Sequence, residues 1–109
     1  MSKIVNIVAS QCQPEAEKKF NEWYNTVHIP MLMKFKGLKG VKRCKALQPP
    51  KENPVYLALY EFDSLKDVEA FGKSPEMAAA RDEMKESWKE GGLQIKWAAP
   101  YELLGEWHK

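Results

Sequence analysis

A stripe of apolar residues between positions 16 and 31 has the spacing of one buried helix face. Its members are Ala16, Phe20, Trp23 or Tyr24, Val27 and Met31. Pro14 suits the first turn of this helix, because its missing N–H needs no partner there. Pro30 removes a backbone donor and disfavours helical geometry for Ile29, so the regular helix is predicted to kink or end close to His28.

Four segments have the short, β-branched or alternating composition of strands. They are Ile4–Ser10, Gly40–Leu47, Val55–Phe62 and Leu93 to about Ala99. In the last of these, Ile95 and Trp97 are predicted to share one face. The proline-rich segment 49–54 is predicted to be the loop that joins the second and third strands as a hairpin.

Two further helices are predicted from their start and stop signals. Asp63 or Ser64 caps the first, and Ser74 with Pro75 starts the second, which Gly91 and Gly92 end. The element order is therefore β-α-β-β-α-β, which predicts an α+β, ferredoxin-like fold with a four-stranded antiparallel sheet. Both faces of the third strand are apolar, so the face without helices is predicted to pack against the same face of a second copy in a homodimer.

Composition narrows the class of protein. The 109 residues predict one domain spanning 1–109, and 44% hydrophobic with 29% charged residues is ordinary for a globular chain. The net charge of +2 does not favour nucleic-acid binding, and no apolar run is long enough to span a membrane, so a cytoplasmic location is expected. Cys12 and Cys44 lie in no metal-ligand spacing, so we expect free thiols and no metal site.

His28 is the strongest candidate for chemistry, because only an imidazole changes charge near neutral pH without a perturbed pKa. The alternative is a helix-end histidine that caps carbonyl groups and faces solvent. Tyr24, four residues earlier, lies on the same flank and either orients a substrate oxygen or belongs to the core. Asn6 interrupts an apolar strand and binds either a substrate carbonyl or a neighbouring side chain.

Other candidates are weaker. Arg43 and Glu61 lie on adjacent strands and form either an anchor for a carboxylate or, the favoured interpretation, a cross-strand ion pair. Tyr60, Trp88 and Trp97 are predicted to line a substrate pocket, or to belong to the core. Four methionines add deformable apolar walls that would suit a flat hydrophobic ligand, and these are Met31, Met33, Met77 and Met84.

Several motifs together resemble one known superfamily. They are the Trp23-Tyr24 to His28-Ile29-Pro30 helix end, the Gly37-Leu38 to Gly40-Val41 strand entry and the Phe71-Gly72-Lys73-Ser74-Pro75 corner. With the β-α-β-β-α-β order, they resemble the dimeric α+β barrel superfamily, most closely its EthD-like members. The resemblance implies a small-molecule pocket between helices and sheet, often without metal or organic cofactor, with His28 and Tyr24 at its wall and Asn6 pointing in.

The chain departs from two branches of this superfamily. Plant-type polyketide cyclases carry a tyrosine and a histidine where this chain has Phe71 and Met77, which cannot transfer protons. The haem-degrading branch expects a tryptophan near Phe71 and a histidine where Arg81 stands, so haem is not expected as a cofactor.

Two functions remain open. One is a cofactor-independent enzyme, an isomerase, cyclase, lyase or cofactorless oxygenase, acting on a small aromatic, lactone or polyketide-like substrate with His28 as general acid and base. The other is a non-catalytic dimer that binds a hydrophobic small molecule or serves as an accessory protein of a degradation pathway.

Overall fold

The fold is described for residues 3–48, 51 and 54–109 of a computed structural model. Within this part of the chain, strands and helices alternate in the predicted order. The elements are β1 (Ile4–Cys12), η1 (Pro14–Ala16), α1 (Glu17–Trp23), η2 (Tyr24–His28), α2 (Ile29–Leu32), β2 (Gly40–Lys45), β3 (Tyr56–Phe62), α3 (Leu65–Gly72), α4 (Pro75–Ser87) and β4 (Leu93–Glu102).

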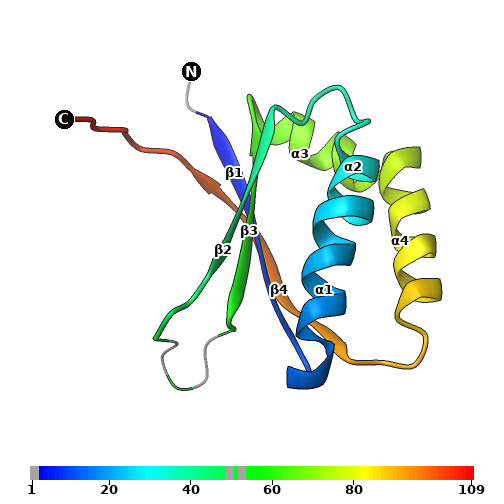
Figure 1. Cartoon of the computed structure of the whole chain (residues 1–109). Coiled ribbons are helices and arrows are strands. Elements are labelled where there is room, and N and C mark those ends of the chain that lie inside the picture. The colour runs from blue at the N-terminus through cyan, green and yellow to red at the C-terminus, as the bar shows by residue number, and fades with distance from the viewer. Residues whose placement is uncertain (1–2, 49–50, 52–53) are drawn as a thin grey trace.

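The strands form one antiparallel sheet in the order β2-β3-β1-β4. All helices lie on the same side of this sheet, and α1 runs beside α4 (Figure 1). The predicted ferredoxin-like α+β fold is therefore confirmed. The predicted loop between β2 and β3 covers residues 49–50 and 52–53, which lie outside the described residues.

The alternating side chains of β3 divide the sheet into a helix-covered face and an open face. Tyr56, Ala58, Tyr60 and Phe62 are buried under the helices, whereas the residues between them are only half-buried. Phe20 of α1 is fully buried, with its ring centroid 4.9 Å from that of Tyr56. This aromatic layer attaches the first helix to the middle of the sheet.

The chain stays helical through Pro30, and the irregularity predicted close to His28 is a change of helix type, not an end of the helix. A π-helical turn, η2, follows α1 directly, and the Ile29 N–H donates to the carbonyl of Tyr24. Pro30 then stands in the first turn of α2, where a proline needs no backbone partner. The wider π-helical turn therefore lets the helix continue although Pro30 has no N–H to donate. Such turns are often found at functional sites.

A β-bulge changes the faces of β4. Ala9 pairs with Trp97 and Ser10 pairs with Ile95, so Lys96 is an extra residue on β4. Ile95 consequently lies on the helix-covered face and Trp97 on the open face. The prediction that these two side chains share a face is wrong, because simple alternation cannot anticipate an inserted residue.

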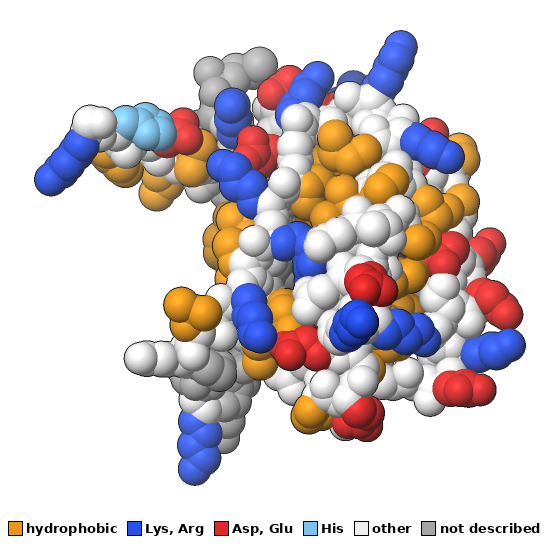
Figure 2. Space-filling model, viewed as in Figure 1, with side chains coloured by type: hydrophobic (Ala, Val, Ile, Leu, Met, Phe, Trp, Pro, Cys, Tyr) orange, Lys and Arg blue, Asp and Glu red, His pale blue; other side chains and the backbone are white. Residues whose placement is uncertain are grey.

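The open face and the end of the chain carry exposed apolar side chains. Trp97 is 42% and Tyr101 is 51% exposed on β4. Beyond β4 the chain extends away from the sheet (Figure 1), and Figure 2 shows orange side chains along this extension. None of the described helices is long and apolar enough to cross a membrane.

Ser74 provides a stability test of the corner between α3 and α4. Its buried hydroxyl accepts from the N–H of Met77 (3.1 Å) and donates to the carbonyl of Phe71 (2.7 Å). Ser74→Ala removes both bonds, so the free energy of unfolding should fall by about 1–2 kcal/mol. Urea unfolding followed by circular dichroism measures the change.

The matched control is Ala79→Ser, which exchanges the same two residue types at an exposed position of α4. It should cost only about 0.5 kcal/mol of helix propensity. Equal losses in the two variants would show that the Ser74 hydroxyl does not stabilise the corner.

Candidate functional site

A cavity of about 330 Å³ lies between the helices and the helix-covered face of the sheet. Its lining includes His28 from η2, Asn6 from β1 and a stripe of Met77, Arg81 and Met84 along α4. Most of its walls are apolar, and the few polar groups come from separate elements. This combination is typical of a site that binds a small organic molecule.

The inner end of the cavity holds a pair of tyrosines. The hydroxyls of Tyr24 and Tyr60 are hydrogen-bonded at 2.7 Å, and both side chains are buried. Burial raises the pKa of the Tyr24 hydroxyl and raises the pKa of Tyr60 well above its usual value. Both phenols are therefore neutral at physiological pH. Because one hydroxyl donates to the other, the accepting hydroxyl keeps its own hydrogen for a ligand.

His28 lies beside this pair, between two aromatic rings. Its imidazole stacks on Trp23 with ring centroids 4.7 Å apart and meets Tyr24 edge-on at 5.0 Å. The Nδ1 atom is buried and has no hydrogen-bond partner among the described residues. Because almost none of this atom's surface is accessible, a ligand in the cavity can meet the imidazole only at the other ring nitrogen, Nε2.

Burial sets the protonation state of His28. Desolvation lowers the pKa of the imidazole from 6.5 to about 4, although the carboxylate of Glu83 opposes the shift. The ring is therefore neutral at pH 7. The alternative of a helix cap that faces solvent does not fit this burial.

Glu83 on α4 holds the ring on which His28 stacks. The Trp23 Nε1–H donates to Glu83 Oε1 at 2.8 Å, and the hydroxyl of Ser87 donates to the other oxygen of the same carboxylate. The Glu83 carboxylate therefore fixes the Trp23 indole at its N–H edge. Sequence reasoning missed Glu83, because it is one of several acidic residues on α4.

Arg43 lies outside the cavity, behind Tyr24. Its guanidinium stands 4.3 Å from the Tyr24 ring centroid and donates to Asn21 Oδ1 (2.9 Å) and Asn25 Oδ1 (2.8 Å). Glu61 instead pairs with Lys42 at 3.5 Å. The predicted Arg43–Glu61 ion pair is wrong, because Arg43 points toward the helices and Glu61 toward the open face.

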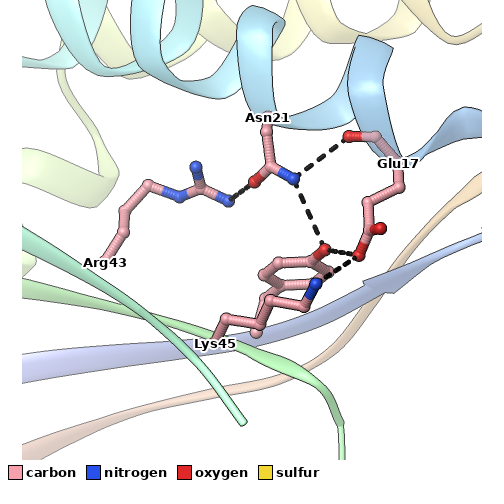
Figure 3. Close-up of polar contacts among 5 residues, drawn as sticks. Glu17, Asn21, Arg43 and Lys45 are labelled. Atoms are coloured by element: carbon pink, nitrogen blue, oxygen red, sulfur yellow. Dashed lines mark hydrogen bonds and ion pairs between the residues drawn. The ribbon is translucent and has the colours of Figure 1, made fainter. Parts of the chain in front are cut away.

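Asn21 continues this contact into a polar network at the edge of the sheet (Figure 3). Its Nδ2 donates to the carbonyl of Glu17, and the hydroxyl of Tyr56 donates to the Glu17 carboxylate. Lys45 forms an ion pair with Glu17 at 3.0 Å. The network joins α1 to β2 and β3, so Arg43 supports the tyrosine pair and does not reach into the cavity.

The structure brings together four of the predicted site residues and separates three. His28, Tyr24, Asn6 and Tyr60 line the cavity. Trp88 lies in the core, with its ring centroid 5.7 Å from that of Trp23, and Trp97 lies on the open face, so neither lines the cavity. Arg43 is the third residue outside it.

Of the four methionines that were predicted to form apolar walls of the pocket, two do so. Met77 and Met84 line the cavity, whereas Met33 is 44% exposed and Met31 lines a separate groove. Sequence reasoning also gave no binding role to Arg81, although its spacing from Met77 and Met84 places it on the same helix face. Among the described residues, no group of three histidine, cysteine or acidic side chains is arranged to hold a metal ion.

Comparison with known proteins identifies the family. Residues 3–96 match DUF4286, a domain of unknown function, and the chain belongs to this family. No curated protein matches the chain in sequence.

Solved structures share the fold at low sequence identity. An EthD family protein from Bacillus halodurans has a TM-score of 0.69 at 18% identity, covering 95% of this chain and 100% of its own. A dimeric ferredoxin-like protein of unknown function from Bacteroides fragilis has a TM-score of 0.66 at 18% identity, covering 93% and 96%. A Bordetella bronchiseptica protein provisionally named an antibiotic biosynthesis monooxygenase has a TM-score of 0.67 at 16% identity, covering 98% and 100%. The predicted resemblance is confirmed for the fold.

The titration of His28 tests the geometry of the cavity. In a His108→Gln background, which leaves one histidine, NMR should show the His28 ring neutral down to a pKa of about 4. Because the unfolded chain takes up this proton near pH 6.5, the free energy of unfolding should fall as the pH is lowered from 6.5 toward 4. A titration at the usual value would mean that the ring is solvated.

Proposed function

We propose that the cavity binds a small, largely hydrophobic molecule with a carbonyl or phenolic oxygen, and that the protein catalyses a proton transfer on it without a metal or organic cofactor. The observation that carries this proposal is the neutral imidazole of His28, which lines the cavity beside the Tyr24–Tyr60 hydroxyl pair. A neutral imidazole can accept a proton, and the free tyrosine hydrogen can be donated to the ligand oxygen.

The proposed chemistry depends on the charges that it creates. Removing a proton next to the carbonyl gives an enolate, while His28 becomes an imidazolium. In a cavity with few polar groups these two charges stabilise each other, and the tyrosine hydroxyl stabilises the enolate oxygen as an oxyanion-hole donor. Asn6 on β1 can donate a further hydrogen bond from its amide. Returning the proton to another carbon would complete an isomerisation.

The burial of His28 also favours a second function, which is binding of a ligand without catalysis. A histidine whose pKa is lowered to about 4 is a weak base at neutral pH, and general-base catalysis is most efficient when the pKa lies near the working pH. In this alternative His28 only accepts a hydrogen bond, and the protein carries or senses its ligand. The EthD and monooxygenase names of two structural neighbours are those proteins' own, and they favour the enzyme.

Deuterium exchange separates these two functions. With 2-tetralone as the probe in D₂O, the wild-type protein should accelerate exchange of the hydrogens next to the carbonyl, as measured by ¹H NMR. His28→Gln, which keeps a polar side chain of similar size, should reduce this acceleration by about 100-fold.

The matched control is His108→Gln, which removes the other histidine at an exposed position outside the cavity. It should exchange at the wild-type rate. Binding of the ketone without any acceleration by the wild-type protein would exclude the enzyme and leave the carrier.

The open face of the sheet supports the further proposal of a homodimer. Leu57 and Leu59 on this face are only half-buried in one chain, and Trp97 is 42% exposed. Packing these side chains against a second copy would remove them from water. The Bacteroides fragilis neighbour is described as dimeric.

Light scattering tests this assembly. The wild-type protein should have twice the mass of one chain, and Leu59→Lys should give a monomer, because a charge in the interface would be desolvated without a partner. Ala70→Lys places the same charge on the exposed surface of α3 and should remain dimeric. A wild-type monomer at micromolar concentration would contradict the proposed interface.

A further inference from the structure

Arg81 is the one side chain among the described cavity-lining residues that carries a full charge at neutral pH. The other polar groups of the lining are an amide, two phenols that burial keeps protonated and the neutral imidazole. Arg81 is itself exposed, so it stands where the cavity meets solvent. A ligand that fills the cavity would pass this guanidinium at its outer end.

Nothing in the described chain neutralises this arginine. It takes part in no ion pair or side-chain hydrogen bond among the described residues. Its own helix offers no acidic residue three or four positions away, because positions 77, 78, 84 and 85 are methionine, alanine, methionine and lysine. This contrasts with Arg43, whose guanidinium is held by two asparagines.

Two neighbours on α4 show that Arg81 lies along the cavity wall. Met77 and Met84 lie one turn before and one turn after it on α4, and both line the cavity. The apolar part of the arginine side chain therefore continues the apolar stripe, while its guanidinium presents several N–H donors at the opening. A planar carboxylate matches this fork of donors better than any neutral oxygen group.

We infer that Arg81 binds a carboxylate on the ligand and so makes the site specific for small aromatic or polyketide-like acids. The inference rests on the proposed function, because it assumes that the cavity holds a ligand. The apolar body lies between the α4 methionines and the sheet, and its inner oxygen reaches His28 and the tyrosine pair. The carboxylate remains at the solvent-facing end, so the charge is never fully desolvated.

Calorimetric titration with matched ligands tests this assignment. The probes are benzoate and 2-naphthoate, each compared with its neutral carboxamide of nearly identical shape. The wild-type protein should bind each carboxylate about tenfold more tightly than its carboxamide, and this preference should weaken as salt is added. In Arg81→Met, which keeps the apolar stripe and a good helix former, the preference should disappear while the carboxamide affinity is retained.

Two further variants complete the design. Lys85→Met removes a positive charge from an exposed position four residues away that does not line the cavity, so the full preference should remain. Arg81→Lys keeps the charge without the planar fork and should retain part of the preference. Loss of the preference in Lys85→Met as well would overturn the inference, because net charge alone would then explain it.

The remaining outcomes separate this inference from the proposed function. Equal affinity of the wild-type protein for acid and amide would overturn the role of Arg81 and leave the cavity as a binding site. No binding of any of the four probes by the wild-type protein would overturn both.

Discussion

The hydrogen bond between the hydroxyls of Tyr24 and Tyr60 is the interaction on which the candidate site depends. It joins the π-helical turn to the centre of the sheet at 2.7 Å, between two buried side chains. One hydroxyl donates to the other, which lowers the cost of burying both groups and leaves one hydroxyl hydrogen free. Because His28 follows Tyr24 by one helical turn, fixing Tyr24 also fixes the imidazole.

The surroundings of this pair keep it in place from both sides. Behind Tyr24, the Arg43 guanidinium packs on the ring and is itself held by Asn21 and Asn25. On the other side, Trp23 stacks on His28 and is anchored to α4 through Glu83. Arg43 and Glu83 thus lie outside the cavity and support its walls, while the groups around the tyrosine pair inside it stay neutral. That arrangement explains why burial prevails over the nearby carboxylate in setting the pKa of His28.

Much of the fold followed from local sequence signals. Of the two predicted caps of α3, Asp63 and Ser64, it is Ser64 that accepts from the N–H of Asp67. Ser74 starts α4 as predicted and accepts from the N–H of Met77. The π-helical turn and the bulge at Lys96 could not be predicted. Each is a one-residue irregularity whose cost is offset by tertiary packing. The periodic pattern of apolar residues carries no information about that packing.

The candidate site was predictable only in part. Asn6 was found because an amide is unusual in an apolar strand. His28 and Tyr24 were found because they lie four residues apart on one helix flank and match the helix-end motif of the EthD-like resemblance. Trp88 and Trp97 were misplaced, since an aromatic residue has the same signature in a core, on an open sheet face or in a cavity. Arg81 was overlooked because a charged residue on an amphipathic helix ordinarily faces solvent, and only the cavity beside it suggests another role.

The central claim is that the space between α4 and the sheet is a binding site, and methionine-methyl NMR tests it most directly. The methyl groups of Met77 and Met84 line the cavity, whereas those of Met31 and Met33 lie outside it. During titration with a library of small aromatic acids and ketones, the account predicts that the first two resonances shift together with the His28 ring while the other two stay unchanged. Shifts confined to Met31 and Met33, or no shift with any compound, would contradict it.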